Sequence, residues 1–123
     1  MNKEDYVSLE VAKMLKEKGF GEPCNKWYGR NGSIFNDAHK SNHNNSIPND
    51  SRISMPSLYE AQKWMRESHN IDVLPIIREE SLPKKDYCCY IYKNAKVVSC
   101  KVAYGEDFYE CMNDSLLEAL KLI

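Results

Sequence analysis

Residues 87–104, YCCYIYKNAKVVSCKVAY, decide the fold class. Two runs, Tyr87 to Lys93 and Val97 to Tyr104, are rich in β-branched and aromatic residues, and a short turn at Asn94-Ala95 joins them. In the second run alternate residues are expected to share one face of a strand, and these are Val98, Cys100, Val102 and Tyr104. The pattern predicts a β-hairpin.

A further strand is predicted just before this hairpin, from Ile71 to Ile77. Pro75 interrupts it, and because proline cannot donate to a strand ladder, we expect either an edge strand or a bulge here. Three strands that follow one another with no helix between them predict an antiparallel sheet.

Amphipathic helices are predicted on both sides of the strands. Two of them begin with a capping-box pattern, at Ser57–Glu60 and at Asp107–Glu110. The first should run to about residue 69, and the second, with apolar residues at i, i+3, i+4 and i+7, to the last residue. Another helix is predicted over residues 6–18, with Gly19 as its left-handed end.

The segment between the first two helices lacks any helical or strand period. Apolar clusters on either side of Gly29-Arg30-Asn31-Gly32 favour an irregular hairpin within residues 24–35. Residues 36–54 hold five asparagines and few apolar side chains, which predicts a flexible loop insertion. We therefore expect a single α+β domain over residues 1–123, in the order α, long loop, α, β, β, β, α, with the helices on one face of a three-stranded antiparallel sheet.

Length and composition exclude several classes of protein. A chain of 123 residues suits one domain. Its formal net charge of −1 provides no overall field toward nucleic acid or an anionic membrane. No apolar run approaches the ~20 residues that span a bilayer, and Met1–Asp5 opens no hydrophobic signal segment. Five cysteines without a repeated spacing favour reduced thiols, so we expect a cytoplasmic protein.

The glycine-flanked loop is the best candidate for ligand binding. Aromatic and arginine side chains on such a loop supply stacking and bidentate hydrogen bonds. The candidate residues are Lys26, Trp27, Tyr28, Arg30 and Asn31. They favour a nucleotide or another small anionic ligand. The alternative is that Trp27 and Tyr28 only attach the loop to the core.

The first strand of the hairpin offers a candidate interface. If Cys89 and Ile91 face the helices, then Cys88, Tyr90 and Tyr92 form a stripe on the opposite face. A row of exposed tyrosines suits a protein interface or self-association. Ordinary cross-strand aromatic packing explains the stripe equally well. The acidic residues of the last helix are either a solvated surface or a docking face for a basic partner.

Metal and catalytic sites are disfavoured by the sequence. His39 and His43 stand four residues apart, but no helix is predicted there and no third ligand has a supporting spacing. Cys24 with one of these histidines lacks an orienting third group. We predict no metal, no cofactor and no catalytic residue, and an enzyme is the less favoured class.

Residues 57–123 have the element order of a double-stranded RNA-binding domain, which makes RNA binding a third hypothesis. Such domains resemble one another by a lysine-rich start to the last helix. Here residues 105–110 are GEDFYE, whose carboxylates repel a phosphate backbone. Lys84 and Lys85 give the only local support, and neighbouring acids offset them. Nucleic acid is therefore an unlikely partner on charge grounds.

Four stretches resemble a family of short proteins from gut anaerobes, typical of phage, prophage and other mobile-element genes. They are DYVSLEVAKMLKEKGF (5–20), EPC (22–24), PSLYEAQKWMRE (56–67) and LLEALKLI (116–123). The resemblance covers nearly the whole chain outside residues 36–54 and implies a setting, but no activity and no site residue. We expect a non-enzymatic accessory protein of a phage or mobile element that binds another protein or itself. A small-ligand binder is the alternative.

Overall fold

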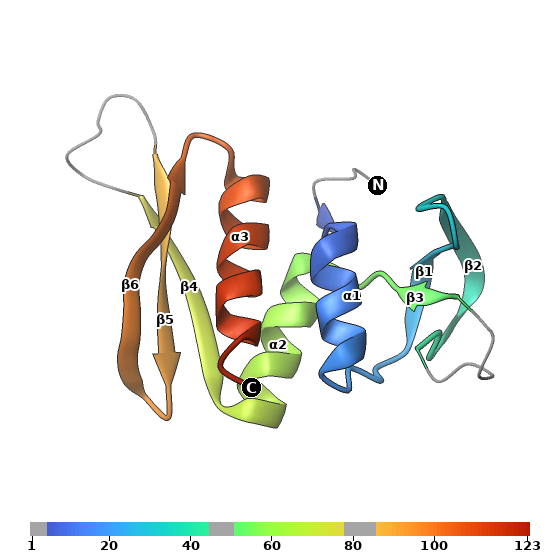
Figure 1. Ribbon diagram of the computed structural model, residues 1–123, viewed down its shortest axis with the longest axis horizontal. Helices are drawn as coiled ribbons and strands as arrows, with labels where there is room; N and C mark the ends of the chain where they lie inside the picture. The colour runs from blue at the N-terminus through green and yellow to red at the C-terminus, as the bar shows by residue number, and fades with distance from the viewer. Residues whose placement is uncertain (1–4, 45–50, 78–85) are drawn as a thin grey trace. The chain divides into compact units, whose positions relative to one another are not determined.

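The computed structural model describes residues 5–44, 51–77 and 86–123, and for residues 100–104 it describes the backbone only. These residues form three helices and two three-stranded antiparallel sheets (Figure 1). The α+β class is therefore confirmed, whereas the prediction of one sheet is wrong. The chain divides into two compact units, Met1–Ala61 (unit 1) and Gln62–Ile123 (unit 2), and the boundary lies within helix α2 (Leu58–His69). None of the helices among the described residues is long and apolar enough to cross a membrane.

Unit 1 begins with helix α1 (Leu9–Glu17), three residues later than predicted. Ser8 caps it, because its Oγ accepts a hydrogen bond from the Val11 N–H at 3.3 Å. Gly19 follows the helix with a φ of 96°, the left-handed conformation that the sequence predicts there. The next residue, Phe20, is buried and its N–H donates to the Leu15 carbonyl.

The sheet of unit 1 has the strand order β2-β1-β3, with β1 at Cys24–Tyr28, β2 at Ile34–Ser41 and β3 at Ile53–Ser54. The predicted hairpin is confirmed. The predicted loop over residues 36–54 is wrong at both ends, since β2 continues through the first part and β3 lies in the last. Residues 45–50 of that loop lie outside the described residues.

Polar groups hold His43 and Asn44, the described residues that follow β2, to Ser54 of β3. The Asn44 Oδ1 accepts from the Ser54 N–H at 2.8 Å, and its Nδ2 donates to the Phe20 carbonyl at 2.9 Å. The Ser54 Oγ in turn accepts from the His43 N–H at 3.1 Å. These amide and hydroxyl groups replace backbone partners, a form of order that a hydropathy pattern does not reveal.

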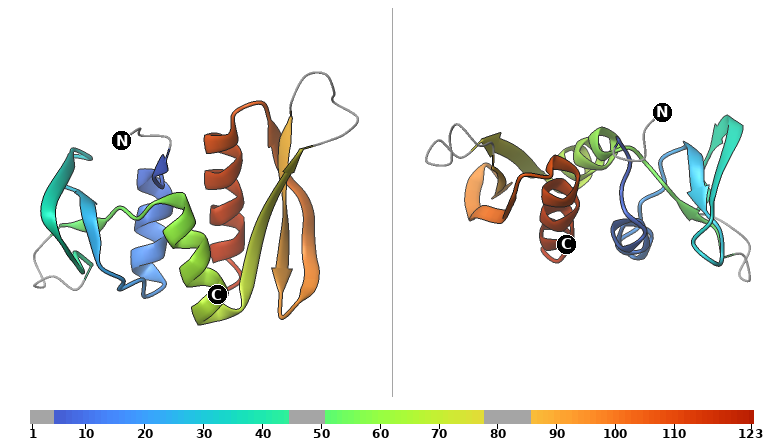
Figure 2. Two further views of the ribbon diagram at one scale, coloured as in Figure 1. Left: turned by 180° about the vertical axis from the view of Figure 1, so that it is seen from behind. Right: turned by 90° about the horizontal axis from the view of Figure 1, so that it is seen from above.

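In unit 2 the strand order is β4-β5-β6, with β4 at Ile71–Ile77, β5 at Tyr87–Lys93 and β6 at Lys96–Gly105. β4 is an edge strand, one of the two alternatives that Pro75 predicts. Helix α3 (Phe108–Leu120) follows the sheet, capped by Asp107 and ending three residues before the predicted end. Figures 1 and 2 show α3 along one face of this sheet. Its predicted stripe is buried except at its two ends, where Phe108 is 42% exposed and Ile123 is half-buried.

Strand β6 is irregular. Its pairing with β5 passes from Tyr87↔Gly105 through Cys89↔Val102 and Ile91↔Ser99 to Tyr92↔Val97, so β6 gains one residue over β5 at each step. Each extra residue is a bulge, and a bulge moves the following side chains to the other face. The regular alternation predicted for residues 98–104 does not allow for these bulges. The side chains of residues 100–104 lie outside the described part of the chain.

Candidate functional site

The outer face of the β4-β5-β6 sheet, opposite α3, is the first candidate site. Residues paired directly across two antiparallel strands project to the same face. The pairs on this face are Leu74↔Tyr90, Asp72↔Tyr92, Ile76↔Cys88 and Tyr92↔Val97. The opposite face buries Ile71, Val73, Cys89 and Ile91 on the side of α3. Apart from Asp72, these pairs place apolar or aromatic side chains away from the helix.

Several of these side chains are exposed although they are apolar. Leu74 is 44%, Ile76 38% and Val97 51% exposed, and Tyr90 and Tyr92 are half-buried. The tyrosine stripe predicted from the sequence therefore has its two aromatic members on this face. Its third predicted member, Cys88, is fully buried at 0% exposure and offers no accessible surface. Leu74, Ile76, Tyr90, Tyr92 and Val97 are called the outer-face cluster below.

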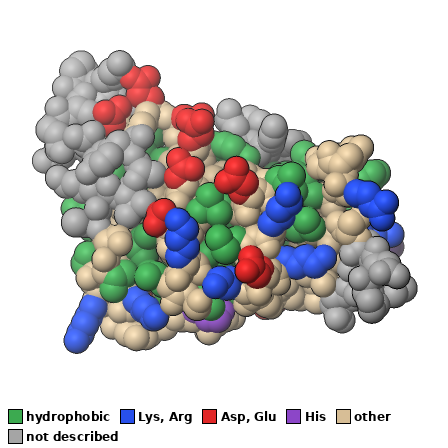
Figure 3. All heavy atoms as spheres, in the orientation of Figure 1, with side chains coloured by type: hydrophobic (Ala, Val, Ile, Leu, Met, Phe, Trp, Pro, Cys, Tyr) green, Lys and Arg blue, Asp and Glu red, His purple; other side chains and the backbone are tan. Residues whose placement is uncertain are grey.

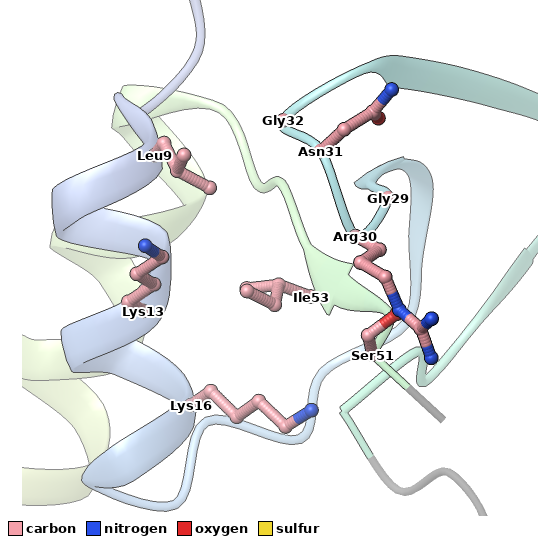
Figure 4. Close-up of a pocket in the computed structure, with 9 residues that line it drawn as sticks. All are labelled: Leu9, Lys13, Lys16, Gly29, Arg30, Asn31, Gly32, Ser51 and Ile53. Carbon is pink, nitrogen blue, oxygen red and sulfur yellow. The ribbon is translucent and has the colours of Figure 1, made fainter. Parts of the chain in front are cut away.

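The second candidate site is a pocket of about 450 Å³ within unit 1. Helix α1, the turn between β1 and β2, and the start of β3 form its walls (Figure 4). The lining residues are Leu9, Lys13, Lys16, Gly29, Arg30, Asn31, Gly32, Ser51 and Ile53. Three of the nine are cationic and none is acidic. This set is called the basic pocket below.

The turn of the basic pocket depends on its glycines. Gly29 has no room for a side chain, since a Cβ there would lie 2.7 Å from Cε2 of Phe35. Gly32 has a φ of 82°, which side-chain-bearing residues rarely adopt. The Gly29 N–H donates to the Ser33 carbonyl at 2.8 Å and closes the turn. Arg30 and Asn31 are thereby held, exposed, at its tip.

Of the five predicted ligand-binding residues, the structure brings only Arg30 and Asn31 to the pocket. Tyr28 is buried and its hydroxyl donates to the Val7 carbonyl at 2.8 Å, so it attaches the strand to the core. The Lys26 Nζ lies 5.2 Å from the centre of the Tyr6 ring. Both therefore have partners within the fold.

Trp27 is also occupied by neighbours of its own unit. Its ring stacks on Phe35 with 4.4 Å between centroids, and the Arg52 guanidinium lies 4.4 Å from the ring centre. The indole Nε1 donates to the Asp37 Oδ2 at 3.2 Å. Trp27 thus fastens the β1–β2 hairpin, which is the alternative that the sequence left open.

Sequence reasoning missed Lys13 and Lys16 of the basic pocket. The two lysines lie on α1 in the same helical row as Leu9, at spacings of four and three residues. The sequence alone gives such residues the pattern of a solvated helix face. Only the tertiary structure brings this row opposite the β1–β2 turn.

His43 and Cys24 form no nucleophile–base pair. His43 is only 3% exposed, and its Nε2 lies 3.1 Å from the Cys24 carbonyl oxygen. Burial, and then the nearby Glu60, raise the pKa of the Cys24 thiol to about 12. A thiol with so high a pKa is protonated at neutral pH and is a poor nucleophile. Among the described residues no group of three or more His, Cys, Asp or Glu side chains is placed to hold a metal ion.

The start of α3 bears on the RNA hypothesis. Elements α2, β4, β5, β6 and α3 follow in the expected order, yet Glu106, Asp107 and Glu110 are exposed at the N-terminus of α3. Figure 3 shows acidic side chains gathered where α3 lies in Figure 1. Carboxylates here suit the helix dipole and disfavour a phosphate backbone. Lys84 and Lys85 lie outside the described residues.

Comparison of this chain with protein-family models, with curated proteins and with solved structures found no match.

Proposed function

We propose that this chain is a non-enzymatic accessory protein that associates through the outer-face cluster of the β4-β5-β6 sheet, with a second copy of itself as the partner. The observation that carries the proposal is the exposure of Leu74, Ile76 and Val97, at 44%, 38% and 51%, together on one face. An exposed contiguous apolar surface costs free energy in water, and docking of another surface removes that cost.

Charge favours a second copy as the occupant. Among the pairs whose side chains on this face the structure describes, only Asp72 is charged, so these parts of two such faces meet without a large like-charge repulsion. The formal net charge of −1 adds little repulsion between whole chains. Two twisted sheets that pack face to face through apolar side chains make a β-sandwich, with ~10 Å between the sheets.

The size of the face indicates a reversible association. Three strands of seven to ten residues offer less area than the ~800 Å² per partner of a standard stable interface. We therefore expect a dimer that dissociates on dilution. The resemblance to short phage and mobile-element proteins supports the accessory role in this proposal.

The test is sedimentation velocity across a wide concentration range, with Leu74→Asp as the disrupting variant. Leu74 is on an edge strand and 44% exposed, so a carboxylate there leaves the core intact but is buried without a partner in the dimer. Tyr59→Asp is the matched control, because Tyr59 is 65% exposed on α2 and belongs to unit 1, whereas the sheet belongs to unit 2.

We expect the wild type and Tyr59→Asp to dimerise with rising concentration, and Leu74→Asp to stay monomeric with an unchanged circular dichroism spectrum. A wild type that remains monomeric at the highest concentration contradicts self-association. A Leu74→Asp variant that dimerises as the wild type does would move the interface elsewhere.

A further inference from the structure

The basic pocket of unit 1 combines a local positive charge with apolar walls. Lys13, Lys16 and Arg30 contribute three cations to its lining, against no carboxylate, in a chain whose overall charge is close to zero. The positive charge is thus a property of this site and not of the whole surface. Figure 3 shows Lys and Arg side chains on the viewed face over α1. An anion that approaches this pocket meets no opposing charge from its walls.

The cations are held on two sides of the pocket. Lys16 is fixed on the α1 side, because its Nζ donates to the Arg52 carbonyl at 2.8 Å. Arg30 comes from the β1–β2 turn on the other side, where Gly29 and Gly32 fix the backbone. Figure 4 shows Arg30 across the pocket from Lys13. A phosphate monoester presents three terminal oxygens around one centre to donors on both sides, one more than the two of a carboxylate, and it carries the larger negative charge.

The floor of the pocket suits an apolar body. Leu9 and Ile53 point toward each other between α1 and β3, and both are only half-buried (Figure 4). The volume of about 450 Å³ falls in the range of ~300–1,000 Å³ that small-molecule sites occupy. It exceeds what a lone inorganic phosphate fills. A ligand that uses the whole pocket therefore carries an apolar or aromatic body beside its phosphate.

We propose that the basic pocket binds a phosphate monoester with an aromatic body, namely a nucleoside monophosphate. The phosphate lies between Lys13, Lys16 and Arg30, and the base or sugar covers Leu9 and Ile53. This site is independent of the outer-face cluster and lies wholly in unit 1, so either proposal stands if the other fails.

The test is calorimetric titration of the full chain at low salt with the four common nucleoside monophosphates. Inorganic phosphate and adenosine, each of which contains one part of a monophosphate, are titrated for comparison, and a short oligonucleotide is titrated at low and at high salt. The sharpest variant is Leu9→Glu, matched by Leu9→Gln. Leu9 is the first residue of α1, next to the Ser8 cap, where a carboxylate suits the helix dipole. Leu9→Glu therefore keeps the helix while it places a negative charge inside the pocket. Arg30→Gln and Lys13→Gln each remove one cation, and Lys63→Gln removes an exposed one from α2 outside the pocket.

We expect at least one nucleoside monophosphate to bind more tightly than phosphate or adenosine alone. Arg30→Gln and Lys13→Gln should each weaken it about tenfold, as the loss of a charge-assisted hydrogen bond does. Leu9→Glu should abolish binding, while Leu9→Gln and Lys63→Gln retain it. Circular dichroism checks that each variant is folded.

Three results would overturn the proposal. The first is no heat and no change in melting temperature with any nucleoside monophosphate at millimolar concentration. The second is phosphate bound as tightly as the monophosphates, which leaves a simple anion site without a role for Leu9 and Ile53. The third is binding restricted to an oligonucleotide with a steep salt dependence, which would assign the cations to a nucleic acid backbone.

Discussion

At the scale of single residues, the buried thiols have a consequence for stability. Cys24, Cys88, Cys89 and Cys111 are all buried as thiols. Burial, which disfavours the thiolate, is the main reason that the pKa of Cys24 and of Cys111 is raised from 9.0 to about 12. It also raises the pKa of Cys89, whose Sγ lies 3.6 Å from the Met112 Sδ. These cysteines act as small apolar side chains of the two cores.

Alkaline pH should destabilise the protein through these thiols. Between about pH 9, where an unfolded thiol loses its proton, and about pH 12, where folded Cys24 does, the folded state binds more protons. The free energy of unfolding therefore falls as pH rises through this window, by up to ~1.4 kcal/mol per pH unit for each thiol. Urea unfolding of the wild type and of Cys24→Ala at several pH values measures the difference. Equal pH slopes for the two proteins would contradict a raised pKa at Cys24.

At the scale of elements, the turn between β5 and β6 stores backbone strain. Asn94 and Ala95 have φ values of 54° and 64°, two consecutive left-handed residues that match the twist of a two-residue hairpin. Asn94 is supported there, since its N–H donates to the Asn70 carbonyl at 3.0 Å and its Oδ1 accepts from the Asn70 Nδ2 at 3.1 Å. The methyl side chain of Ala95 cannot make a hydrogen bond of this kind, and at a positive φ its Cβ lies too close to the following carbonyl oxygen.

Ala95→Gly should therefore stabilise the protein by about 1 kcal/mol, because glycine adopts a positive φ without a steric cost. Ala95→Val should destabilise it, since a β-branched residue is worse than alanine at positive φ. Thermal unfolding of the three proteins gives the order. A melting temperature that is lower for Ala95→Gly than for the wild type would show that turn strain is not what limits this hairpin.

The helices and strands differ in how well the sequence predicted their ends. Helix ends were predictable wherever one side chain makes the cap, as at Ser57, where the Oγ accepts from the Glu60 N–H at 3.0 Å and the Glu60 Oε1 accepts from the Ser57 N–H at 2.9 Å. Six of the eight residues of β2 and all of β3 were missed, because hydrogen bonds between residues far apart in the sequence, such as that from the Ser54 N–H to the Asn44 Oδ1, hold this part of the chain. For the basic pocket, the sequence predicted Arg30 and Asn31 as binding residues. Its lysines on α1, Lys13 and Lys16, could not be predicted as binding residues, because only the fold places them opposite the turn.

At the scale of the whole molecule, two cores share one chain. Unit 1 buries residues such as Val11, Leu15 and Met55, and unit 2 buries residues such as Met112 and Leu116. The boundary after Ala61 lies inside α2 and not in a linker. A single helix therefore contributes residues to both units, and its capping box belongs to unit 1 whereas its last two turns belong to unit 2.

This position of the boundary makes a prediction about fragments. Cutting at Gln62 leaves eight of the twelve residues of α2 and removes the Ser57–Glu60 box. An isolated helix of that length is marginal, and loss of the cap alone costs about 1 kcal/mol. Fragment 62–123 should thus melt well below fragment 56–123, although both contain all of unit 2. The Ser57→Ala variant of fragment 56–123 removes the cap but keeps the first turn of the helix. It therefore separates the loss of stability due to the cap from the loss due to the missing turn. The Gln62 Nε2 donates to the Val73 carbonyl at 2.9 Å. If the two fragments have the same melting temperature, this bond and the packing around it are enough to hold the remaining helix. The cap then stabilises unit 1 alone.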